Sequence, residues 1–177
     1  MQIEEMIETL QGSALTDIFT NLDTVEKEQK DEVSWFALEI SHPFDDGSAF
    51  LDLIQFQGSI VFKLRNLARA TNDLSLVART AHVNHMTPMP KMCWDPEDGE
   101  IYLEWQLLGT DPELSPVHLE KILASFLNIF FAERLYFLAA KLKAAELSDG
   151  ILQQVFEPIK KRVEEEYVPA LHAILGE

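Results

Sequence analysis

Cysteine is almost absent from this chain: Cys93 stands alone, so an internal disulfide is impossible. Disulfides are rare in the reducing cytoplasm and common outside it. The first residues, Met1 to Glu5, also lack the basic region followed by an apolar stretch that marks a secretory signal. We therefore expect a cytoplasmic protein.

Basic residues are scarce as well. The 14 Lys and Arg stand against 30 Asp and Glu, which gives a net charge of −16. Such a surface repels phosphate backbones and anionic lipids, and no uninterrupted apolar run approaches the roughly 18–20 residues that span a bilayer. We expect neither nucleic acid nor a membrane as partner. The charge serves solubility alone, or it keeps a binding protein with apolar patches soluble.

Glycine is too rare for a phosphate-binding loop to be easy to build, with 7 in 177 residues. The sequence contains no Gly-x-Ser-x-Gly, no His-Glu-x-x-His and no glycine-rich phosphate loop. We therefore expect a protein that is not an enzyme, with no catalytic residues and no cofactor.

A metal site is the one chemical constellation that the sequence suggests. His82 and His85 lie three residues apart on a predicted helix, and Cys93 follows soon after. The spacing matches no established structural zinc pattern, and a second cysteine is missing. We favour a structural role, with Cys93 as a buried strand residue, and expect no metal.

The composition, with 47% hydrophobic and 25% charged residues, is that of a globular protein. Apolar residues recur with a period of two in several segments that turns separate, which predicts strands joined by hairpins. The predicted strands are residues 33–41, 50–57, 60–65, 91–94 and 100–108, and the polar residues 23–32 are a loop or a strand at the edge of the sheet. We expect an α+β fold in which helices pack on one face of an antiparallel sheet of about five strands.

A long helix is predicted from Ser115, the N-cap, with Pro116 in its first position, to about Glu146. Its apolar residues form two stripes instead of one. The first stripe consists of Leu119, Ile122, Leu123, Phe126, Phe130 and Phe137; the second consists of Leu127, Phe131, Leu135, Leu138 and Leu142. One surface helix usually buries a single stripe. We therefore predict the second stripe as a dimer or partner interface, unless the C-terminal tail folds back onto it.

The tail begins at Asp149-Gly150 and has helical spacing again, and Pro158 and Pro169 should kink or divide it. We divide the chain into an α+β domain, residues 1–148, and a helical extension, residues 149–177.

Two charged residues, Glu133 and Arg134, interrupt the apolar surface of the long helix. They could form a buried pair that sets dimer register. We favour the alternative, in which their stems lie on apolar surface while their charged ends reach water.

Residues 81–130 carry a resemblance to a known family. The helix end His82-Val83-Asn84-His85, the hairpin that runs from Lys91-Met-Cys-Trp-Asp-Pro to Trp105, and the helix that starts at Ser115-Pro116 resemble the bacterial YbjN-type proteins, whose fold is related to type III secretion chaperones. In element order the resemblance covers residues 1–145. It implies an α+β fold, commonly dimeric, that binds protein without catalytic residues or a cofactor. Residues 149–177 depart from the family pattern.

These observations lead to one preferred function and one alternative. The preferred hypothesis is a non-enzymatic protein-binding module, chaperone-like or regulatory, that acts as a homodimer and binds an unidentified protein client. The alternative is a sensor that binds a small ligand in a pocket between the helices and the sheet. A closed apolar cavity would favour the sensor, and an open apolar patch would favour the protein binder.

Overall fold

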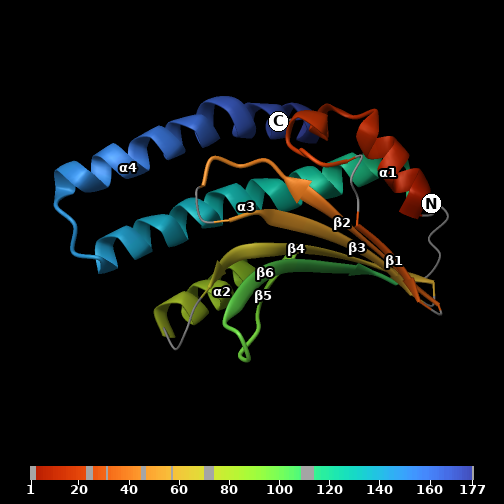
Figure 1. Ribbon diagram of the computed structural model, residues 1–177, viewed down its shortest axis with the longest axis horizontal. Coiled ribbons are helices and arrows are strands. Elements are labelled where there is room, and N and C mark those ends of the chain that lie inside the picture. Colours follow the sequence, from red (N-terminus) through yellow and green to blue (C-terminus); the bar gives the residue numbers. More distant parts are fainter. Residues whose placement is uncertain are drawn as a thin grey trace.

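The computed structural model describes residues 3–22, 26–30, 32–44, 47–56, 58–69, 74–108 and 114–176. It is an α+β fold whose centre is an antiparallel sheet in the order β1-β2-β3-β4-β6-β5. The strands are β1 (Glu26–Lys30), β2 (Val33–Ile40), β3 (Ala49–Phe56), β4 (Ser59–Arg69), β5 (Lys91–Trp94) and β6 (Glu100–Leu107). Helices pack against this sheet, and a long C-terminal helical region packs on them (Figure 1).

All five predicted strands are present, and the polar segment before the first of them adds a sixth. Strand β1 pairs only with β2, so it lies at one edge of the sheet. Its sequence, Glu-Lys-Glu-Gln-Lys, suits that position because charged side chains discourage a further strand from pairing there. The predicted turn at Asp45-Asp46 lies outside the described residues.

Strand periodicity correctly predicts which side chains face the core. On β2, Phe36, Leu38 and Ile40 are buried under the helices, whereas Trp35 and Glu39 point to the opposite face and are partly exposed. The same alternation continues on β3, β4 and β6. The helix-covered face therefore holds the core, and the other face carries mixed polar and apolar side chains.

The first helix, α1 (Ile3–Gln11), buries Ile3, Met6 and Leu10 as its apolar spacing predicts. The apolar segment after it forms one short 3₁₀ turn, η1 (Ala14–Asp17), which Ser13 caps.

Helix α2 (Leu74–Met86) lies beside β5. The apolar spacing of this segment predicts one helical face that contains Leu74, Val77, Ala78, Ala81 and His85, but Ala78, Ala81 and His85 are exposed. Among the α2 side chains that the structure describes, Thr80 and Val83 are buried. The predicted capping residue Asp73 lies outside the described residues.

Helix α3 (Pro116–Ala144) begins where the sequence predicts, and the side chain of Ser115 accepts a hydrogen bond from the His118 amide. It lies along the covered face of the sheet and extends beyond it (Figure 1). By length and composition alone α3 could cross a membrane, and half of its most apolar 18-residue stretch is buried in this structure.

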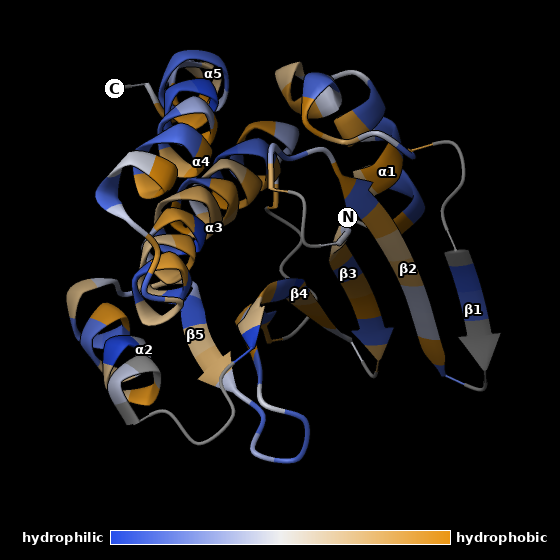
Figure 2. Cartoon of the chain, turned by 60° about the vertical axis from the view of Figure 1, so that its left-hand side comes forward, coloured by the Kyte–Doolittle hydropathy of each residue, from blue (hydrophilic) through white to orange (hydrophobic). Residues whose placement is uncertain are grey.

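The C-terminal region folds back on α3 instead of on the sheet. It consists of α4 (Asp149–Arg162), a π-helical turn η2 (Val163–Tyr167) and α5 (Val168–Leu175). Pro158 does not divide the tail, since α4 runs through it. The helix widens instead just before Pro169, which lacks an amide donor for the preceding carbonyls. In Figure 2 the apolar side of α3 lies between the sheet and these C-terminal helices.

Candidate protein-binding surfaces

The structure places the five predicted interface residues under or beside the C-terminal region. Leu127 and Phe131 are buried, and the Phe131 ring contacts the Tyr167 ring at 4.6 Å between centroids. Leu135, Leu138 and Leu142 are only partly buried. The tail thus covers the near half of the second stripe within one chain, and the far half remains accessible.

The far half of α3 forms a projecting hairpin with α4 (Figure 1). Helix α4 has no buried residue among its 14, and Ile151 and Val155 are 47% and 41% exposed. This arm therefore presents apolar side chains from both helices to solvent. Exposed apolar surface that is shared by neighbouring elements is typical of a contact site for another protein.

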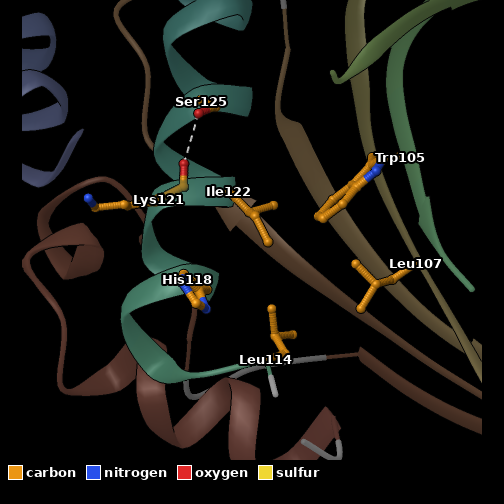
Figure 3. Close-up of a pocket in the computed structure, with 7 residues that line it drawn as sticks. All are labelled: Trp105, Leu107, Leu114, His118, Lys121, Ile122 and Ser125. Atoms are coloured by element: carbon orange, nitrogen blue, oxygen red, sulfur yellow. Dashed lines mark hydrogen bonds between the residues drawn. The ribbon is translucent and has the colours of Figure 1, made fainter. Parts of the chain in front are cut away.

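A groove lies between the first half of α3 and the end of β6. Its volume is about 420 Å³, and it is open to solvent. The lining residues are Trp105 and Leu107 from β6, Leu114 before the helix, and His118, Lys121, Ile122 and Ser125 from α3 (Figure 3). Trp105 forms the floor by stacking on Phe62, with ring centroids 5.7 Å apart. The groove is mainly apolar, with a few polar groups from α3 at its rim.

The strand edge beside this groove has no neighbouring strand among the described residues. Strand β5 pairs with Ile101–Glu104 of β6 and stops there, whereas β4 continues on the other side as far as Leu107. Within the described part of the chain, no strand lies against the outer edge of Trp105, Gln106 and Leu107. This short edge leaves main-chain groups available next to an apolar groove, an arrangement that can accept an extended peptide.

The rest of that sheet edge is closed by a single side chain. The Asn84 amide donates to the Met92 carbonyl and accepts from the Met92 amide, both over 2.6 Å. Asn84 thus makes the two hydrogen bonds that a neighbouring strand residue would make to β5. Lys91 adds bonds to the Asn84 and Thr87 carbonyls at the end of α2. The outer edges of β5 and β1 are therefore protected against pairing with a further strand, whereas residues 105–107 of β6 are not.

The two charged residues of α3 are both buried, and they do not pair with each other. Glu133 accepts two hydrogen bonds from Arg79 of α2, at 2.7 and 2.8 Å. Arg79 also lies over the Tyr136 ring. The favoured prediction, with charged ends in water, is wrong for both residues, since Glu133 and Arg134 are 6% and 5% exposed.

Arg134 joins α3 to the end of β4. It donates to the Asn66 carbonyl and to the Leu67 carbonyl, the latter over 2.8 Å, and it lies over the Phe44 ring. A planar guanidinium suits this position because it donates in several directions and stacks on aromatic rings. Both charged residues therefore stabilise the packing of one chain.

The open face of the sheet holds one buried acid. Asp52 of β3 lies opposite Lys63 of β4 and accepts a hydrogen bond from Arg65 over 3.0 Å. Burial raises the pKa of its carboxyl above the ordinary value, although Arg65 and Trp35 hydrogen-bond to it. The arrangement links β3 to β2 through Trp35 and to β4 through Arg65.

The residues of the suspected metal site do not come together. His82 and His85 are exposed on α2, while Cys93 is half-buried on β5, facing away from the core. Burial raises the pKa of the Cys93 thiol, which disfavours the thiolate form that binds metals. No group of three or more His, Cys, Asp or Glu side chains within the described ranges is placed to hold a metal ion.

Several residues of these surfaces were not predicted as functional. Asn84 looked like a helix residue, and only the fold brings it to Met92. Leu107 belongs to β6 and Leu114 precedes α3, so a period count on either element does not join them. The one available signal was the length difference between the two hairpin strands, four residues against eight, which leaves part of β6 without a partner.

Comparisons with protein-family models, curated proteins and solved structures found no match.

Proposed function

We propose that this chain is a non-enzymatic protein-binding module, chaperone-like or regulatory, that works as a homodimer in the cytoplasm. Its client would be an extended segment of another protein, held in the groove between β6 and α3. The observation that carries the proposal is the free edge of Trp105–Leu107 beside that groove. The YbjN-type resemblance points to the same class of function.

The groove defines the chemistry of the client. A strand added next to β6 would turn alternate side chains toward Trp105, Leu107 and Ile122, so those positions should be apolar. The other positions would lie on the open face, next to Gln106. Because the chain has a net charge of −16, basic residues at those positions are favoured.

The binding test uses a labelled ten-residue peptide in which valine and lysine alternate, measured by fluorescence anisotropy. Leu107→Arg places a charge in the groove and should weaken binding by at least tenfold. Leu108→Arg is the matched control, because Leu108 is 75% exposed and does not line the groove. The same peptide with proline at alternate positions should not bind, since proline cannot donate the ladder hydrogen bonds. Equal loss in both arginine variants, or no binding by the valine–lysine peptide, contradicts the proposal.

Homodimer formation is proposed on the projecting α3–α4 arm. Its half-exposed residues, Leu135, Leu138 and Leu142 on α3 with Ile151 and Val155 on α4, would lie against a second copy. Light scattering at tens of micromolar should give twice the chain mass, and a strictly monomeric protein contradicts this part.

The alternative function, a small-ligand sensor, uses the same groove. A volume of about 420 Å³ suits a small molecule, and His118 and Lys121 offer polar contacts. The open side favours a peptide, because a site for a small ligand usually buries most of the ligand surface. A small molecule that co-purifies and is displaced by Leu107→Arg would favour the sensor.

A further inference from the structure

The reversal of the chain after α3 is poorly supported by its own sequence. Helix α3 stops at Ala144, and Glu146 takes a left-handed conformation with φ of 51°. Glycine is the usual residue at that point, because any side chain with a Cβ is strained there. The segment Lys-Ala-Ala-Glu-Leu, residues 143–147, consists entirely of good helix formers. The turn therefore depends on the docking of the C-terminal helices.

That docking is concentrated at the far end of the tail. Val163, Tyr167 and Leu171 are buried against α3 and its neighbours, whereas α4 buries no residue. Helix α4 is about 21 Å long at 1.5 Å per residue. The tail is thus anchored by its last buried residues and not by α4. These anchor residues can make the same contacts with α3 of their own chain or with α3 of a second copy.

The arm also carries little of the negative charge of the chain. Residues 135–162 contain five basic residues, which are Lys141, Lys143, Lys160, Lys161 and Arg162, and three acidic ones, which are Glu146, Asp149 and Glu157. The last three basic residues pair with Glu164, Glu165 and Glu166 in the next turn, so residues 135–166 are close to neutral, at −1, in a chain of −16. Two arms that lie side by side avoid the charge repulsion that the acidic remainder would cause.

We propose that the homodimer forms by exchange of the C-terminal region, so that residues 149–176 of each chain pack on α3 of the other. This inference rests on the homodimer of the proposed function. Tyr167 of η2 then keeps its ring contact with Phe131, now on the partner's α3, and Glu146 leaves its left-handed conformation. Exchange of an identical element requires no new recognition surface. The half-exposed apolar residues of the two arms cover one another in the dimer.

The first test uses variants of the turn, which leave the packed contacts intact. Glu146→Gly removes the backbone strain at the turn of the unexchanged chain. It should weaken dimerisation on the order of tenfold, because opening the turn then relieves no strain in either chain. Glu146→Asn should act in the same direction, since asparagine tolerates this conformation. Glu146→Gln removes the charge but keeps the strain, and it should dimerise like the wild type. Equal dimerisation of the glycine and glutamine variants would overturn the proposal.

The second test shows which chain supplies the tail. Cysteines replace Phe131 and Tyr167 in a Cys93→Ser background, and a short bis-maleimide links them at low protein concentration. Exchange should give covalent dimers on a denaturing gel. A dimer by light scattering that yields only internally linked single chains overturns exchange and leaves the homodimer standing. A monomer throughout contradicts both. If the double variant does not fold, the glycine and glutamine pair decides alone.

Discussion

The rings of Tyr167 and Phe131 are in contact, with 4.6 Å between their centroids. The two residues lie 36 positions apart in the sequence, one in the π-helical turn and one in α3. This contact determines how much of the second apolar stripe of α3 is covered. Within one chain it makes the tail a cover over Leu127 and Phe131, and it limits the accessible stripe to Leu135, Leu138 and Leu142.

Removing the anchor of the tail should release the C-terminal region. Tyr167→Ala deletes a buried aromatic side chain and should lower the free energy of unfolding by about 3 kcal/mol, measured by urea denaturation. Val155→Ala is the control, because Val155 is 41% exposed and should change stability by less than about 0.5 kcal/mol. Hydrogen exchange should accelerate in residues 163–175 of the tyrosine variant, and unchanged exchange there would show that the tail is held elsewhere.

Replacing Asn84 should lower the free energy of unfolding far more than replacing another helix residue of similar exposure. Asn84→Ala leaves the Met92 amide and carbonyl without partners, which should cost about 2 kcal/mol. His85→Ala, on the exposed side of the same helix, should be nearly neutral. The amides of β5 should lose hydrogen-exchange protection only in the asparagine variant. Equal protection in both variants would mean that α2 does not hold the edge.

The two kinds of charge pair in this chain should differ in their effect on stability. Arg79→Ala leaves Glu133 buried without its partner and should destabilise the protein by about 3 kcal/mol. Lys161→Ala breaks an exposed pair with Glu165 and should change stability by less than about 0.5 kcal/mol. The double variant Arg79→Met with Glu133→Leu should recover much of the loss, because no charge then remains buried. A double variant as unstable as Arg79→Ala would contradict this account.

Asp52 should make stability depend on pH in the direction opposite to that of a salt-bridged surface acid. Burial raises the pKa of its carboxyl, so the folded chain binds this proton more tightly than the unfolded chain does. The contribution of the protonated form to stability is therefore lost as the pH rises from the unfolded value, about 3.9, through the folded value. Wild type should lose stability relative to Asp52→Asn across this range, as followed by urea denaturation. An Asp52 pKa below about 3.9 by NMR would reverse the prediction.

Local patterns were sufficient for most of the secondary structure. The alternation in β2 predicted that Phe36 and Leu38 face the core, and Ser115-Pro116 correctly placed the start of α3. Both features depend on neighbours within a few residues. For α2 the same reasoning chose the wrong face, because polar contacts orient this helix: Arg79 binds Glu133, and Asn84 binds Met92. A hydrophobic period carries no information about such partners.

The sequence by itself determined the acidic surface, the α+β class, and an α3 with more apolar surface than a sheet alone can cover. Each of these follows from composition or from spacing along one element. Only the tertiary structure decided that Val163, Tyr167 and Leu171 cover the near half of that surface, that Glu133 and Arg134 are buried, and that Trp105–Leu107 remains a free edge beside a groove. These outcomes depend on which segments, tens of residues apart, reach the same place, and such long-range choices are made by packing and hydrogen bonding in the folded chain.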